Sequence, residues 1–106
     1  MLKVKGGVRY EVGDSVRYEA APGASTAIGR IIGFPSGVGG DDGEQRVEMF
    51  EMRKPANGHP REIMVNSIKK LLPASCLSGR VIVLGKADFE RRVYASRDSD
   101  IYFSRA

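Results

Sequence analysis

The chain contains no tryptophan, one cysteine and one histidine in 106 residues. Its single cysteine, Cys76, cannot form a disulfide within the chain, and with His59 as the only histidine no Cys/His set has zinc-finger spacing. The longest apolar run, residues 81–84, is far shorter than the ~20 residues that a membrane-spanning helix needs. The first seven residues also lack the apolar segment of a secretory signal. These absences favour an intracellular protein without structural zinc.

Groups that could carry catalysis are scarce. Cys76 lies in an apolar passage, which predicts a buried structural thiol, and His59 stands between glycine and proline, which predicts an exposed loop histidine. The glycine-rich segment 36–40 lacks the Lys-Ser/Thr pair of a phosphate-binding loop, and the acids of the same predicted loop lack the spacing of a calcium-binding loop: Asp41, Asp42 and Glu44. We therefore expect no enzyme, no catalytic residue, no metal or other cofactor and no small-molecule substrate.

The charge balance is basic but not concentrated. Seventeen Lys and Arg against thirteen Asp and Glu give a net charge of +4, and the basic residues are spread along the chain apart from a few pairs. Such a balance is compatible with contact to nucleic acid or nucleosomes, and equally with a solvated surface. With 42% apolar and 28% charged residues, the chain has the composition of one globular domain spanning residues 1–106.

The pattern of the chain predicts a mainly all-β fold. Thirteen glycines separate short runs rich in Val, Ile, Tyr and Phe. The expected strands are residues 8–12, 15–19, 27–34, 46–53, 62–65, 67–73, 80–84 and 100–105. A turn or bulge is expected at Gly13-Asp14, and a change of the inward side between Met49 and Phe50 indicates either a bulge or burial on both sides. One short helix is expected near residues 86–93, where Phe89 and Val93 share a face. Four residues are expected in the core: Ile31, Phe50, Val81 and Val83.

The order of these segments resembles the BAH (bromo-adjacent homology) domain of chromatin proteins. The resemblance begins with "VGD" at residues 12–14 between two strands and continues through "IGRI" at residues 28–31. Its most specific stretch is residues 62–84, which is similar to the family pattern "EL-LS…L-EIP…I-GKC-VL". The closing "YFSR" at residues 102–105 is similar to the family's final "YFCR" strand. The resemblance covers about residues 8–105.

Membership of this family implies a distorted β-barrel with short accessory segments and no catalytic activity. It also implies a location in the nucleus and a role in chromatin processes such as gene silencing. We therefore expect a non-catalytic protein-protein interaction module that docks to nucleosomes, to histones or to another chromatin protein, without a membrane partner. Two alternatives remain: a double-stranded DNA-binding module, and an intramolecular scaffold domain of a larger chromatin protein.

Many BAH domains hold methylated lysine in an aromatic cage, which uses cation–π attraction. The resemblance places Ala27, Met49 and Glu51 at the cage positions, and an alternative register places Glu51 and Arg53 there instead. Neither register supplies an aromatic side chain. We therefore expect no methyl-lysine cage, while Glu51 leaves open the recognition of an unmodified lysine or arginine.

A second candidate site is a basic surface. Arg53, Lys54 and Arg61 flank the irregular segment around His59, and the predicted helix carries Arg91 and Arg92 on its polar side. Loops on a rigid scaffold are the usual place for binding groups. These five residues are expected to contact nucleosomes electrostatically, with DNA contacted through phosphates rather than through bases. The alternative is that they only keep the domain soluble.

Overall fold

The structure is a computed structural model that describes residues 2–3, 8–35, 45–95 and 100–105. The expected loop acids at positions 41, 42 and 44, and the glycine-rich segment 36–40, lie outside the described residues. The mainly β fold is confirmed. The described elements are β1 (Leu2–Lys3), β2 (Arg9–Tyr10), β3 (Ser15–Tyr18), β4 (Ala27–Gly33), β5 (Arg46–Arg53), β6 (Met64–Pro73), the 3-10 helix η1 (Ala74–Cys76), β7 (Leu77–Gly85), α1 (Lys86–Ala95) and β8 (Ile101–Ser104).

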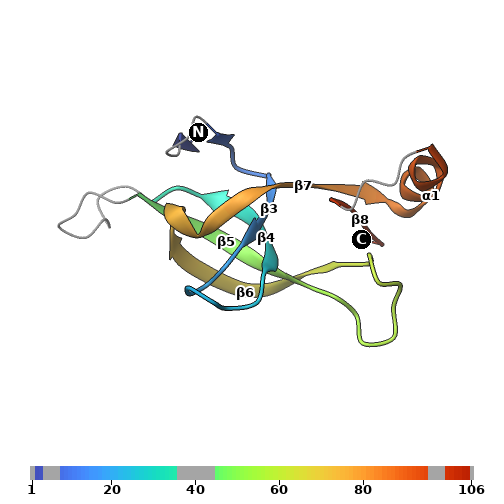
Figure 1. The fold of residues 1–106 in the computed structure, drawn as a ribbon, viewed down its shortest axis with the longest axis horizontal. Coiled ribbons are helices and arrows are strands. Elements are labelled where there is room, and N and C mark those ends of the chain that lie inside the picture. The colour runs from blue at the N-terminus through green and yellow to red at the C-terminus, as the bar shows by residue number, and fades with distance from the viewer. Residues whose placement is uncertain (1, 4–7, 36–44, 96–99, 106) are drawn as a thin grey trace.

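Six strands form one sheet in the order β6-β5-β4-β3-β7-β8 (Figure 1). Neighbouring strands are antiparallel except β7 and β8, which run parallel. A parallel pair needs a crossover connection, and helix α1 provides it. The first half of β7 pairs with β3 and its second half with β8. Strand β8 and α1 therefore lie together at one end of the molecule, on the right of Figure 1.

The sheet is not the closed barrel that the resemblance implies. Strands β6 and β8 are its two edges, and no ladder of described residues joins them. The residues ahead of β6 contact β8 through a parallel bridge between Glu62 and Phe103. In this bridge the backbone N–H of Ile63 donates to Phe103 and that of Phe103 donates to Arg61, at 2.9 and 3.0 Å. The sheet stays open because β8 has only four residues and pairs with the second half of β7. At that position β8 contacts the residues ahead of β6 rather than β6 itself.

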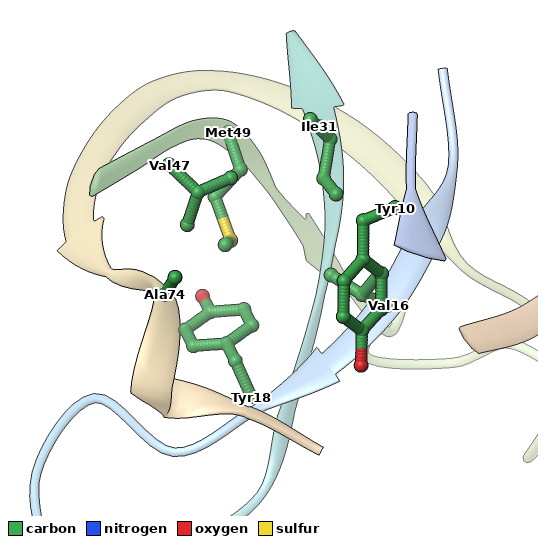
Figure 2. Packing of buried hydrophobic residues seen from close by; sticks show 7 residues of the cluster. All are labelled: Tyr10, Val16, Tyr18, Ile31, Val47, Met49 and Ala74. Carbon is green, nitrogen blue, oxygen red and sulfur yellow. The ribbon is translucent and has the colours of Figure 1, made fainter. Parts of the chain in front are cut away.

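Both faces of the sheet are buried in part. One face carries a large cluster, shown in Figure 2, that contains Tyr10, Val16, Tyr18, Ile31, Val47, Met49 and Ala74. Because successive residues of a strand point to opposite faces, Ile28 and Met52, which pair across β4 and β5, lie on the other face. They belong to a second cluster, completed by Ile63, Val81 and Tyr102. A third cluster joins α1 to β8 through Phe89, Ile101 and Phe103.

The strand expected over residues 8–12 is shorter than predicted, since β2 contains only Arg9 and Tyr10. Tyr10 is buried, while 41% of Val8 and 60% of Val12 is exposed. The chain leaves the strand at a turn, as predicted for Gly13. This residue has a φ of +96°, a conformation that glycine adopts without the steric cost of a side chain, and its N–H donates to Ile31 at 2.8 Å.

The two strands expected over 62–65 and 67–73 form the single strand β6 instead. The pairing of β5 with β6 is irregular between Phe50 and Met52, which confirms a bulge near its predicted place. There the Asn66 side chain accepts the N–H of Ile68 at 2.9 Å. A side-chain acceptor thus satisfies the backbone locally, and β6 continues past the irregularity.

Of the four expected core residues, Ile31 and Val81 are buried and Val83 is half-buried against the second cluster. Phe50 was placed in the core wrongly. It is half-buried and lies outside the three clusters, with the Lys69 ammonium 6.0 Å from its ring. Its neighbour Met49 alternates regularly with Val47 along β5, and both lie in the large cluster, so Phe50 points to the opposite face.

The expected helix is confirmed. Helix α1 begins at Lys86, as predicted, and ends at Ala95, two residues beyond the predicted end at residue 93. Phe89 is 4% exposed and forms the buried side of α1, while the side chain of Val93 lies outside what the structure describes. Among the helices of the described chain, none has the length and apolar character to cross a bilayer.

Candidate interaction surface

The three degenerate cage positions lie on one face of the sheet. Met49 pairs with Ile31 and Glu51 with Gly29 across β4 and β5, so Ala27, two residues before Gly29, shares their face. Met49 is completely buried in the large cluster, and Ala27 is half-buried against it. Met49 is therefore not exposed to a ligand, and neither position supplies an aromatic group for a cage.

Glu51 is already paired with cations of the domain itself. Its carboxylate lies 4.0 Å from the Lys70 ammonium and 3.3 Å from the Arg53 guanidinium, and only 17% of its side chain is exposed. Lys70 also lies 5.9 Å from the centre of the Tyr18 ring. Burial raises the pKa of Tyr18 above its ordinary value, and the negative charge of Glu51 adds to this shift. The structure therefore gives no support to capture of an incoming lysine or arginine by Glu51.

The adjacent residues Arg53 and Lys54 have different partners. Arg53, the last residue of β5, donates to Glu51 on the face of the large cluster. Lys54 is exposed, and its ammonium lies 5.9 Å from the centre of the Tyr102 ring, which belongs to the second cluster. The pair expected to act as one basic unit is thus divided between two faces of the sheet.

Arg61 also makes hydrogen bonds within the fold. Its guanidinium donates to the backbone oxygen of Ile101 at 3.4 Å, and its own backbone oxygen accepts from Phe103. The side chain is half-buried. Arg61 therefore fixes the segment ahead of β6 against β8 and offers only part of its surface to a partner.

The two arginines of α1 are exposed, as expected from their positions on the helix. Arg91 pairs with Asp88 one turn earlier, at 3.0 Å, in an ion pair whose two side chains are both mostly exposed. No carboxylate of the described residues lies within ion-pair distance of Arg92. An exposed pair of this kind contributes about 0–1 kcal/mol, so Asp88 does not hold Arg91 strongly.

An aromatic contact brings the loop after β5 next to α1. The His59 ring lies 5.7 Å from Phe89 of α1 and 5.5 Å from Phe103 of β8, edge to face in both cases. Its Nδ1 accepts the backbone N–H of Arg61 at 3.0 Å. His59 is exposed, as predicted, but it also holds the loop against the third cluster. The sequence carries no local signal for this contact because its three rings come from separate elements.

Two further basic residues at this end of the sheet were not anticipated. Arg105 pairs with the buried Glu62 at 2.7 Å. Arg17, on β3, pairs with Asp100 at 2.6 Å and donates to the Tyr102 hydroxyl at 3.2 Å. These partners are separated by more than forty positions in each case, so only the fold could identify them.

Cys76 and His59 lie beyond opposite ends of β6, the longest strand among the described residues. Cys76 is half-buried and outside any disulfide, rather than buried as expected, and with Glu19 and Leu77 it borders an open cleft of about 490 Å³. Because the ten-residue strand β6 separates it from the His59 loop, the two residues do not form a catalytic pair. Within the described ranges, no three His, Cys, Asp or Glu side chains gather as metal ligands would.

Compared with known proteins, the chain matches no protein-family model and no curated protein. The resemblance to the BAH domain therefore remains a hypothesis.

Proposed function

We propose that the domain is a non-catalytic chromatin interaction module of the nucleus, related to BAH domains, which docks to nucleosomes, to histones or to another chromatin protein. The observation that carries the proposal is the contact of His59 with Phe89 and Phe103. It places the basic loop after β5 beside the basic helix α1, although more than twenty positions of sequence separate them. A rigid scaffold thereby presents a composite basic surface, the form that binding sites on loops commonly take.

The composite basic surface consists of Lys54, Arg61, Arg91 and Arg92, with Arg53 at its border. Phosphate contacts made by such residues release counterions from DNA, so the affinity for nucleosomes should fall with salt, with a log–log slope of about −0.9 per phosphate contacted. Docking of this kind fixes position and orientation without reading bases.

A parallel pull-down with nucleosomes, free histone tails and naked DNA tests the proposal. Preference for nucleosomes or histone tails supports it. Equal or tighter binding to naked DNA would favour the double-stranded DNA binder. Binding to none of the three would contradict docking to nucleosomes or histones and would restrict the partner to another chromatin protein or to another part of the same polypeptide.

The paired substitution Arg91→Ala with Arg92→Ala tests the surface itself. We expect a weaker affinity for nucleosomes and a salt slope flatter by about 1–2 units, because one or two phosphate contacts are lost. The matched control is Arg9→Ala with Arg80→Ala, which removes the same charge from exposed residues of β2 and β7. An unaltered slope in the first variant, or the same change in both, would contradict the proposed surface.

A further inference from the structure

A cleft of about 280 Å³ opens on the face of the sheet that carries the second cluster. Its apolar lining includes Ile28, Met52 and Ile63, each 9% exposed or less. Its polar lining includes Arg17, Lys54 and Tyr102, which come from β3, from the residue after β5 and from β8. The cleft thus combines an apolar floor with two cations. Of the composite basic surface, Lys54 also lines this cleft, whereas Arg91 and Arg92 of α1 do not.

The two cations flank one aromatic ring. The guanidinium carbon of Arg17 and the ammonium of Lys54 each lie 5.9 Å from the centre of the Tyr102 ring. Cation–π attraction therefore already engages the ring with charges of the domain itself. A ring so occupied does not favour a third cation, and the ligand expected here has the opposite charge.

The electrostatic balance of the cleft fits one negative charge. Arg17 is held by Asp100 at 2.6 Å and by the Tyr102 hydroxyl at 3.2 Å, which fixes its position and offsets its charge. For Lys54, no carboxylate of the described part of the chain lies within ion-pair distance. Among the described residues that line the cleft, Lys54 is therefore an exposed cation with no carboxylate at ion-pair distance.

We infer that this cleft binds a glutamate or aspartate of an acidic peptide segment in a partner protein, with the apolar neighbour of that residue on the floor formed by Ile28, Met52 and Ile63. The Lys54 ammonium pairs with the carboxylate, and Arg17, whose guanidinium also lies 5.9 Å from the centre of the Tyr102 ring, adds positive potential. At about 280 Å³ the cleft is near the small end of ligand sites, the size for one or two side chains.

A nucleic-acid backbone fits the same cleft less well. It brings no aliphatic group to cover the apolar floor, and its successive phosphates would approach the Asp100 carboxylate beside Arg17. Like charges at close distance repel, and an apolar floor left in water gains nothing from binding. The peptide is therefore the occupant that both the floor and the charge favour.

The probe for this inference is the acetylated and amidated pentapeptide Gly-Leu-Glu-Leu-Gly, compared with the same peptide in which glutamine replaces glutamate. Binding is followed by the NMR shifts of the Ile28 and Ile63 methyl groups and of the Tyr102 amide. We expect the glutamate peptide to shift these signals and to bind at least about fivefold more tightly than the glutamine peptide, a ratio typical of a single charged hydrogen bond.

The substitution Lys54→Gln should weaken the glutamate peptide by about the same factor, while Arg53→Gln should change its affinity less than about twofold. Arg53 is the matched control because it is adjacent, exposed and of equal charge, but is paired with Glu51 on the other face. Unchanged spectra outside the cleft establish that both variants are folded.

Four results would overturn the inference. The first is an absence of binding to the glutamate peptide, and the second is equal affinity for both peptides. The third is an equal loss of affinity for the glutamate peptide in the Lys54→Gln and Arg53→Gln variants. The fourth is that a short DNA duplex at physiological salt shifts the same NMR signals and binds more tightly than the glutamate peptide. The proposed chromatin function can fail independently, because its test uses nucleosomes and the α1 arginines, whereas this test uses neither.

Discussion

The guanidinium of Arg105 binds the carboxylate of Glu62 at 2.7 Å, although 64% of the arginine side chain is exposed and only 5% of the glutamate side chain is. The second carboxylate oxygen accepts the backbone N–H of His59 at 3.3 Å. Glu62 also forms the bridge that joins the residues ahead of β6 to Phe103 of β8. One buried acid therefore joins the end of the chain, the loop after β5 and the residues ahead of β6.

Removal of this partner should destabilise the domain. Arg105→Ala leaves the buried carboxylate with one weak donor, and we expect a loss of about 1–2 kcal/mol in the free energy of unfolding, less than for a fully buried pair because Arg105 remains partly in water. Urea denaturation measures the loss. The control Arg92→Ala removes an exposed arginine and should cost less than about 0.5 kcal/mol. Equal losses in the two variants would contradict a structural role for the Glu62 pair.

Gly29 should not tolerate a side chain. A Cβ at this position would lie 2.6 Å from the Met49 sulfur, 3.1 Å from the Phe50 backbone oxygen and 3.1 Å from the Tyr18 ring. Because the backbone oxygen cannot move without disturbing the ladder of β4 and β5, we expect Gly29→Ala to destabilise the domain by about 1–3 kcal/mol. Gly33→Ala on the same strand meets no atom within 4 Å and is the matched control. Thermal unfolding of both compares them, and equal melting temperatures would contradict this packing.

The glycine spacing and the local apolar pattern were enough to predict the mainly β fold, the turn at Gly13 and the first residue of the helix, because each depends on residues close in sequence. The open sheet could not be predicted in this way. It depends on which half of β7 pairs with β8, and this is a long-range register that no local pattern encodes. The misplacement of Phe50 also has a long-range origin, because its partner across the ladder is Lys69 of β6, whose ammonium lies 6.0 Å from its ring.

The residues of the candidate sites differ in the same way in whether the sequence alone could predict them. The exposure of the α1 arginines follows from helical periodicity around Phe89, and it was predicted. The cleft beside Tyr102 was not, because Arg17 and Tyr102 are 85 positions apart and meet only through the strand order β3-β7-β8. Basic residues that act locally can thus be found from sequence, whereas those assembled by the sheet cannot.

Trimethyl-lysine peptides should bind no better than their unmodified counterparts. A cage contributes on the order of 0.5–2 kcal/mol per well-placed aromatic ring, and here the corresponding positions hold a half-buried alanine, a buried methionine and a carboxylate paired with Lys70 and Arg53. Calorimetric titration of methylated and unmodified histone peptides measures the difference. A tenfold preference for any methylated form would contradict the expectation.

Tyr18→Phe should leave the domain as stable as before or make it more stable, by up to about 1 kcal/mol. Tyr18 is completely buried in the large cluster, among the side chains shown in Figure 2, and its hydroxyl has no hydrogen-bond partner among the described residues. Deleting an unpaired buried hydroxyl removes the cost of its desolvation while the ring keeps its packing. Tyr10→Phe is the control, because Tyr10 is also buried but its hydroxyl is not among the buried, unpaired groups. A loss above about 1 kcal/mol in Tyr18→Phe alone would indicate a partner for the hydroxyl.

The same substitution should also change how the free energy of unfolding depends on pH in the alkaline range. Because burial, and then the charge of Glu51, raise the pKa of Tyr18 above its ordinary value of 10.0, the folded protein keeps this proton at a pH where the unfolded chain has lost it. The Tyr18 hydroxyl therefore contributes to the free energy of unfolding fully below pH 10.0, and this contribution declines as the pH rises from there toward the raised pKa of the folded state. Urea titrations across this range should therefore show a smaller loss of stability with rising pH in Tyr18→Phe than in the unsubstituted domain. Parallel curves for the two proteins would mean that the hydroxyl ionises as easily in the folded state as in the unfolded chain.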